Sequence, residues 1–143
     1  MICRIWDKEN NRFWEDVNEG YNGKIEQLMV STSGELIMRT IDKMIHESLF
    51  PGRFTISWGT GIRDRNNQEI YAGDVLHVEY MLVENVAPFN CLVEWDKFRF
   101  AMRNLDFDKN SAYPSFTPLY NLDPFGMNIE VIGNIYQNKE LIS

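Results

Sequence analysis

The sequence is short of the residues that build covalent frameworks and metal sites. Its 143 residues include two cysteines, Cys3 and Cys91, which lie far apart with no other cysteine near either of them. This spacing excludes a zinc site or a redox pair of the Cys-x-x-Cys kind. One disulfide between the two stays open, but we favour buried free thiols, because nothing else points to an oxidising compartment. We expect no metal and no cofactor.

Long apolar runs are absent as well. No window approaches the ~18 uncharged apolar residues that would span a bilayer. The opening MICRIWDKEN reaches charged residues within seven positions, which leaves no room for the apolar core of a signal peptide. We therefore expect a cytoplasmic protein that does not contact a membrane.

Positive charge is also scarce, with 14 Lys and Arg against 21 Asp and Glu and a formal net charge of −7. This balance disfavours non-specific binding to nucleic acid, because Lys and Arg supply most of the affinity for phosphates. A local basic patch remains an alternative to solvated charges on outward strand faces. Its candidates fall in the middle half of the chain: Arg53, Arg63, Arg65, Lys97, Arg99 and Arg103.

Bulky apolar side chains are plentiful, by contrast. Apolar residues make up 44% of the chain and aromatics 13%, which suits a β core and argues against disorder of the whole chain. The length fits one ordinary domain or two intertwined subdomains.

Short stretches with a period of two dominate the sequence. They predict strands over 2–6, 12–15, 24–30, 35–40, 54–58, 75–83, 91–95, 98–102 and 129–136, with polar loops at 7–11 and 16–23. Many short strands at close spacing favour a small barrel or roll. We expect a mainly β fold with an N-terminal β subdomain over residues 1–52 and a barrel subdomain over 53–143, or one compact domain overall.

One segment breaks the period of two. Ile41, Met44, Ile45 and Leu49 recur at helical spacing. This spacing predicts a short helix over 41–49, which Thr40 could cap. About two turns are marginal for an isolated helix, so packing would have to hold it.

The clearest hairpin predicted from the sequence joins 91–95 to 98–102 through Asp96-Lys97. The stretch that follows, 103–127, contains three prolines and little periodicity. A loop of this length is unusual in a compact domain, so we interpret it as functional, partly structured or mobile.

Three segments of the chain are distinctive: ICRIWDKENNRFW at the start, TGIRDRNNQEIYAGDV in the centre and IEVIGNIYQNKEL at the end. Together and in this order they resemble the YopX family of bacteriophage and prophage proteins. That family is typified by T-G-[LI]-x-D-x-x-G-x-x-I-Y-E-G-D-[IV] in the centre and I-E-V-I-G-N-I-Y-x-N-x-E-L at the close. The resemblance marks a structural signature at Gly61, Asp64, Ile70, Tyr71, Gly73, Asp74, Gly133, Asn134 and Tyr136.

Two positions depart from the family pattern. Gln68 stands where glycine is usual, and we expect the left-handed turn position to shift to Asn66 or Asn67, because Asn tolerates that geometry. Ala72 replaces the usual Glu, so a catalytic carboxylate at that position is not expected here.

The resemblance implies a mainly β protein whose C-terminal part is an SH3-type small barrel. It also implies a phage or prophage origin and action in the cytoplasm of a bacterial host. It implies no established reaction, so the chemistry has to be sought in the residues themselves.

Candidate chemical groups each have a structural alternative. Asp64, Glu69 and Asp74 could hold Mg²⁺ for a nuclease, but Asp at a turn more often bonds to backbone amides. Asp106 and Asp108 resemble the start of a calcium loop whose glycine and closing Glu are missing. His46 and His77 are the only histidines, and neither lies in a nucleophile motif. We therefore assign no catalytic, cofactor-binding or metal-binding residue.

Aromatic and cationic residues alternate on the predicted hairpin, at Trp95, Lys97, Phe98, Arg99, Phe100 and Arg103. Small barrels use such platforms to stack single-stranded bases or to bind partners. A hairpin facing a core would show the same alternation. Exposure of Phe98 and Phe100 beside Arg99 would favour stacking, and their burial would oppose it.

We hypothesise a non-catalytic accessory protein that binds an unidentified host or phage protein, has no enzyme activity, and could self-associate as a homo-oligomer. The alternative is a single-stranded nucleic-acid-binding barrel that uses the hairpin from Cys91 to Met102. A ribonuclease resembling PemK-like toxins is a third hypothesis, and only fold-level analogy suggests it.

Overall fold

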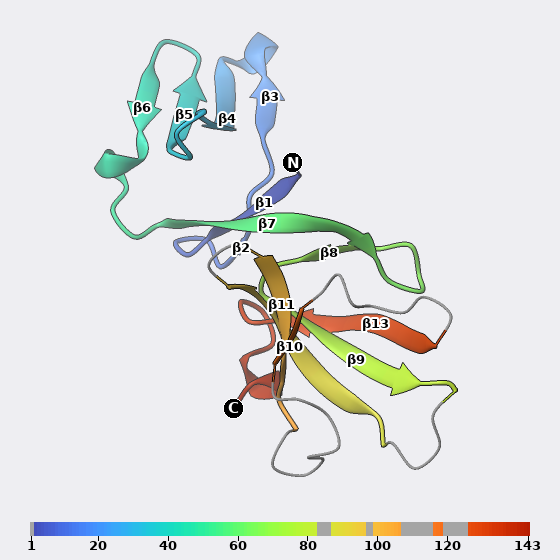
Figure 1. The fold of residues 1–143 in the computed structure, drawn as a ribbon. Coiled ribbons are helices and arrows are strands. Elements are labelled where there is room, and N and C mark those ends of the chain that lie inside the picture. The colour runs from blue at the N-terminus through green and yellow to red at the C-terminus, as the bar shows by residue number, and fades with distance from the viewer. Residues whose placement is uncertain (1, 83–86, 97–98, 107–115, 119–125) are drawn as a thin grey trace. The chain divides into compact units, whose positions relative to one another are not determined.

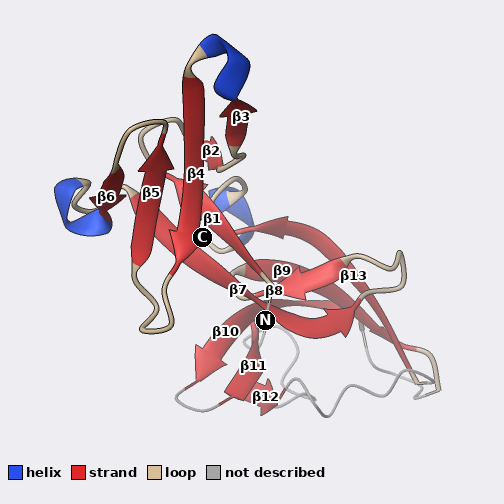
Figure 2. Ribbon diagram, turned by 90° about the horizontal axis from the view of Figure 1, so that it is seen from above, coloured by secondary structure: helices blue, strands red, loops and turns tan. Residues whose placement is uncertain are grey.

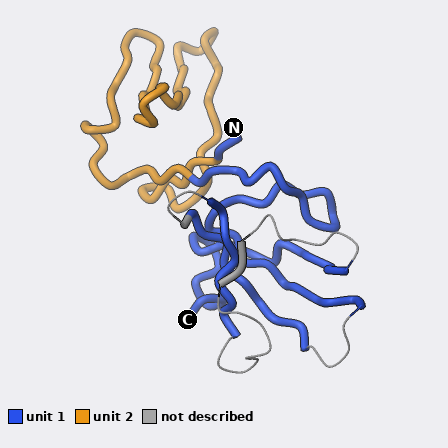
Figure 3. The backbone as a smooth tube through the Cα atoms, in the orientation of Figure 1, with its two compact units in different colours: residues 1–3, 57–143 blue, residues 4–56 orange. Residues whose placement is uncertain are grey.

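The computed structural model describes residues 2–82, 87–96, 99–106, 116–118 and 126–143. The chain forms two compact units, which Figure 3 colours separately: unit 2 is residues 4–56, and unit 1 is residues 1–3 with 57–143. Antiparallel strands dominate both units, so the predicted mainly β fold is confirmed. The division into subdomains over 1–52 and 53–143 stays a prediction.

Unit 2 contains a four-stranded antiparallel sheet in the order β3-β4-β5-β6. Leu28 lies opposite Met38 and Val30 opposite Leu36, and the buried Leu36 and Met38 mark the packed side of this sheet. The elements of this part of the chain, labelled in Figure 1, are β1 (Cys3–Asp7), β2 (Arg12–Phe13), β3 (Val17–Glu19), η1 (Gly20–Asn22), β4 (Lys24–Val30), β5 (Leu36–Thr40), β6 (Met44–His46), η2 (Glu47–Leu49) and the first half of β7 (Phe54–Arg63).

The predicted helix over 41–49 is wrong. Met44, Ile45 and His46 form β6, which pairs with β5. Ile45 is less exposed than its two neighbours, so these residues also fit the period of two of a strand. Pairing with β5 stabilises them more than a helix of only two turns would. Only Glu47–Leu49 is helical, as one 3₁₀ turn. The predicted loop at 16–23 is wrong too, since it contains β3 and η1.

Arg53 and Asp7 form the polar centre of unit 2. The Arg53 Nε and Nη2 donate to the two Asp7 carboxylate oxygens at 3.0 and 3.2 Å, and Asp7 is 1% exposed. The guanidinium also lies 4.7 Å from the ring centre of Phe54. Burial alone would raise the pKa of Asp7, but hydrogen bonds from Arg53 and Asn10 and the Arg53 charge outweigh it and lower that pKa to about 2.

Unit 1 is built on a five-stranded antiparallel half-barrel in the order β12-β11-β10-β9-β13. The described helical segment of unit 1, Lys139–Leu141, is a short 3₁₀ turn after the last strand, and those of unit 2 are equally short (Figure 2). The elements are the rest of β7, β8 (Glu69–Tyr71), β9 (Asp74–Tyr80), β10 (Phe89–Asp96), β11 (Arg99–Asn104), β12 (Phe116–Pro118), β13 (Met127–Asn134) and η4 (Lys139–Leu141).

The core of unit 1 lies on the inner face of this sheet. Its buried members come from β8 to β13: Ile70, Leu76, Val78, Phe89, Cys91, Val93, Met102, Met127 and Ile129. Inner-face positions alternate along β10 at Phe89, Cys91 and Val93, as the period of two requires. The next position in that series is Trp95, and it is 55% exposed. The apolar stripe of β10 therefore continues past the covered core.

The hairpin predicted from the sequence is present, with a different register. Val93 lies opposite Met102, Trp95 opposite Phe100 and Asp96 opposite Arg99. Asp96 is thus a strand residue rather than part of the connection, because the ladder runs further than the apolar pattern indicates. Most of the predicted loop at 103–127 lies outside the described residues.

Helices within the described ranges are too short and too polar for any of them to cross a bilayer.

The buried pair of unit 2 gives a prediction about stability. We expect Asp7→Asn to lower the free energy of unfolding at pH 7 by about 3 kcal/mol, because Arg53 loses its carboxylate. The folded pKa lies below the unfolded one, so this stabilisation is complete above pH about 4 and disappears as the pH falls through about 2. Urea unfolding of both proteins between pH 7 and pH 2 measures the difference.

The control is Glu9→Gln, since Glu9 also lies near Arg53, at 3.3 Å, but is 67% exposed. It should change stability by less than about 0.5 kcal/mol. A stability difference between wild type and Asp7→Asn that stays constant with pH would contradict this role of Asp7.

Candidate functional site

Asp64 lies at the centre of the signature and accepts hydrogen bonds from three backbone amides. Its Oδ1 accepts the N–H groups of Asn66 and Gln68, both at 2.9 Å, and its Oδ2 accepts the N–H of Val131 on β13 at 3.0 Å. Burial alone would raise the pKa of this carboxyl, but the three N–H donors outweigh it and hold the pKa below its usual range. Asp64 therefore ties the turn after β7 to the edge of the half-barrel.

The turn around Asp64 forms without the glycine that the family pattern has in place of Gln68. Asn67 has a φ of 62°, the left-handed region that Asn enters more readily than most residues. One of the two positions proposed to replace the glycine, Asn67 rather than Asn66, is thus confirmed. Gln68 keeps an ordinary backbone and donates its N–H to Asp64.

Gly73 and Asp74 form the second bend of the central segment. The fully buried Asp74 accepts the N–H of Tyr71 at 2.8 Å. Gly73 has a φ of 91°, and a Cβ there would lie 3.3 Å from Ile135 and Tyr136. Its N–H donates to the Val93 carbonyl and its carbonyl accepts the N–H of Ile135, so this glycine joins β10 to the C-terminal segment.

The C-terminal signature folds back on itself. A Cβ on Gly133 would come within 2.6 Å of the Asn138 Oδ1 and 2.7 Å of a Leu141 methyl, so only glycine lets these two side chains close over it. The buried Asn134 accepts the N–H groups of Tyr136 and Gln137. The glycine and the asparagine of this segment therefore shape the backbone.

The carboxylates nominated for metal binding are bonded to the backbone. Besides Asp64 and Asp74, Glu69 accepts the N–H of Gly61 at 2.8 Å, where Gly61 has a φ of 78°. Within the part of the chain that the structure describes, no group of three acidic, His or Cys side chains could hold a metal ion. Asp106 accepts the N–H of Asn90, and Asp108 lies outside the described residues.

The two cysteines are free thiols. Burial raises the pKa of Cys91 to about 12, with a smaller contribution from the Asp106 charge. A thiol with this pKa is not a nucleophile at neutral pH. His77 lies on β9, where it meets the Asn90 side chain at 3.0 Å and Glu79 at 3.3 Å.

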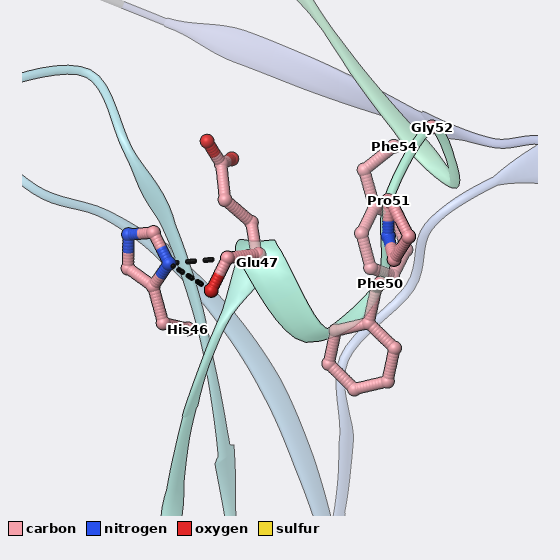
Figure 4. Close-up of a pocket in the computed structure, with 7 residues that line it drawn as sticks. His46, Glu47, Phe50, Pro51, Gly52 and Phe54 are labelled. Atoms are coloured by element: carbon pink, nitrogen blue, oxygen red, sulfur yellow. Dashed lines mark hydrogen bonds between the residues drawn. The ribbon is translucent and has the colours of Figure 1, made fainter.

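A pocket of about 290 Å³ lies beside His46 in unit 2 (Figure 4), walled by Phe50, Pro51 and Phe54. The His46 Nδ1 is 3.0 Å from the Ser48 Oγ, and its Nε2 is 3.3 Å from Glu35. The Ser48, His46 and Glu35 side chains therefore resemble a catalytic triad of nucleophile, base and acid. However, Nδ1 also accepts the Ser48 N–H at 3.1 Å, so its lone pair is occupied by the cap of the 3₁₀ turn. We interpret the cluster as a cap.

The hairpin residues nominated from the sequence divide into three groups. Trp95 is 55% exposed, and its ring meets Phe100 edge-on at 4.8 Å. Phe100 packs partly against the core, which opposes the stacking platform. Arg99 and Arg103 are exposed, and Arg103 forms an ion pair with Glu94 at 3.1 Å. Lys97 and Phe98 lie outside the described residues.

A groove of about 350 Å³ lies next to Trp95. One wall is the β10 stretch from Leu92 to Trp95, and the other consists of Ala72-Gly73 and Ile135-Tyr136. The groove thus joins both signature bends to the exposed hairpin tryptophan, all within unit 1. Sequence reasoning nominated Trp95 but missed the groove, because its walls are distant in sequence.

Asp64 gives a second stability prediction. Asp64→Ala removes the acceptor of three N–H groups, and we expect the free energy of unfolding to fall by about 3 kcal/mol. Urea unfolding followed by circular dichroism measures it. Glu130→Gln is the control, because it removes the partly exposed Glu130–Arg65 ion pair and leaves an amide oxygen to accept from Asn66, so it should cost less than about 0.5 kcal/mol. Equal losses of stability in the two variants would show that Asp64 does not join the turn after β7 to the edge of the half-barrel.

Comparison with known proteins identifies similar structures. The crystal structure of protein YopX from Bacillus subtilis is 22% identical to this chain, has a TM-score of 0.60, and the match covers 99% of this chain and 97% of that one. Protein EF1440 from Enterococcus faecalis is 21% identical with a TM-score of 0.54, over 99% of this chain and 96% of that one. At these identities the two structures share the fold. No curated protein matches the chain.

The family model gives the assignment that the signature indicated. The model described as YopX protein matches residues 3–143, which is nearly the whole chain. The resemblance read from the central and C-terminal segments is confirmed by this match. The chain belongs to the YopX protein family.

Proposed function

We propose that this chain is a non-catalytic protein-interaction module that binds its partner in the groove beside Trp95. The observation that carries the proposal is the exposure of Trp95 at 55%, on a strand whose preceding residues Cys91, Leu92 and Val93 are at most 5% exposed. An exposed tryptophan beside a groove is the usual anchor of a binding hot spot. The bonding of Asp64, Glu69 and Asp74 to backbone amides favours binding over catalysis.

The biological setting is part of the same proposal. The family resemblance supports an origin in a phage or prophage and action in the cytoplasm of a bacterial host. We take unit 1 as an SH3-type small barrel, on the grounds of its five-stranded antiparallel half-barrel. Barrels of this kind commonly bind partners on grooves between their loops and strand ends.

Binding of single-stranded nucleic acid is the second candidate, and the Trp95–Phe100 ring pair beside two arginines favours it. The Arg103–Glu94 ion pair and the packing of Phe100 weaken it. Fluorescence anisotropy with labelled single-stranded DNA and RNA at low salt separates the candidates. We expect no binding, and a salt-sensitive curve lost in Trp95→Ala would favour nucleic acid.

Affinity capture tests the leading proposal. The full chain serves as bait in lysates of Bacillus subtilis and Enterococcus faecalis, the sources of the two similar structures. Loss of a tryptophan hot spot costs at least about 2 kcal/mol, so Trp95→Ala should weaken the recovered complex by about 30-fold.

The matched control is Leu82→Ala, an equally apolar change at a side chain that is 75% exposed. It should retain the complex, and circular dichroism should show both variants folded. A partner recovered equally by wild type and Trp95→Ala would place the binding surface elsewhere.

A further inference from the structure

The groove beside Trp95 follows the edge of a strand. Four consecutive residues of β10, Leu92 to Trp95, line one wall. Successive side chains of a strand point to opposite faces, so a cavity that meets all four runs along the edge of the strand rather than over one face. The side of β10 that faces β9 is paired only up to Leu92, which lies opposite Val75.

The backbone groups of Trp95 point into this groove. Leu105 donates its N–H to the Asn90 carbonyl at 2.8 Å, and Gly73 donates to the Val93 carbonyl at 2.7 Å. Asn90 therefore bonds toward β11 and Val93 toward the opposite side. Because the direction alternates along an antiparallel strand, the N–H and C=O of Trp95 point to the same side as those of Val93. No described residue bonds to either group.

The groove presents apolar walls without net charge. Leu92, Trp95 and Ile135 supply apolar surface. Among the described residues that line the groove, Glu94 alone has a formally charged side chain, and it forms an ion pair with Arg103 at 3.1 Å. Charge complementarity therefore favours an uncharged, apolar occupant over an acidic peptide, a basic peptide or a polyanion.

We propose that the groove binds an extended, uncharged segment of the partner protein by strand addition. One residue of the segment bonds to the N–H and C=O of Trp95, where the ladder between β10 and β9 ends. The apolar side chains of the segment contact Trp95 and Ile135. This proposal rests on the interaction function proposed above and specifies how the partner binds.

Ala72 offers a matched pair of variants. Its side chain lines the groove, at the position where the family pattern has Glu. Ala72→Glu introduces an unpaired charge into the apolar groove, whereas Ala72→Gln adds a neutral side chain of nearly the same size. A difference between the two variants therefore reports charge rather than volume.

The experiment uses a displayed library of random dodecapeptides, selected against the full chain. We expect enriched peptides with alternating apolar residues and no net charge. Their affinity should fall at least tenfold in Trp95→Ala and in Ala72→Glu. It should fall much less in Ala72→Gln, and it should be unchanged in Leu82→Ala. N-methylation of one backbone amide at a time should abolish binding at the single residue that bonds to Trp95. It should have much less effect at the two neighbouring residues, because their N–H groups face away from β10.

Three results would overturn the proposal: no enriched peptide, equal effects of N-methylation at neighbouring positions of the peptide, or a Trp95-dependent dimer in sedimentation, which would make a second copy the occupant. If a partner is still captured in a Trp95-dependent manner while no linear peptide binds, the interaction function stands and strand addition fails. If Trp95→Ala affects neither capture nor peptides, both proposals fail.

Discussion

The carboxylate of Asp64 is the constraint on which unit 1 depends. Edge strands expose unpaired backbone groups that invite pairing with other chains, and β13 is an edge of the half-barrel. Asp64 accepts the Val131 N–H on that edge, and the adjacent Arg65 donates its N–H to the Ile129 carbonyl at 3.0 Å. The turn after β7 thus closes the β13 edge, while β10 keeps an open edge at Trp95.

The two signature segments meet at that open edge. Gly73 bonds to Val93 on one side and to Ile135 on the other, and the turn around Asn134 places Ile135 and Tyr136 on the groove. Residues that shape the backbone therefore also form a wall of the candidate site. A signature whose residues shape the backbone can therefore still bear on function.

Sequence periodicity predicted most strands, because side-chain alternation is local, but it carried the last strand to Tyr136 although β13 ends at Asn134 and a turn follows. The departure of Gln68 from the family pattern predicted the left-handed turn residue at Asn66 or Asn67, and the structure has it at Asn67. The helix over 41–49 failed because Met44 to His46 satisfies both periods, and only pairing with β5 decides between them. The groove was beyond prediction, since its walls come from residues 72–73, 92–95 and 135–136.

The central claim is that β10 has an unpaired edge at Trp95 that a partner occupies. Amide hydrogen exchange by NMR measures this directly, residue by residue. In the free protein we expect slow exchange at Leu92, whose N–H faces β11, and fast exchange at Trp95. Trp95 should become protected when the partner binds. Slow exchange at Trp95 in the free protein, or fast exchange that persists in the complex, would contradict the claim.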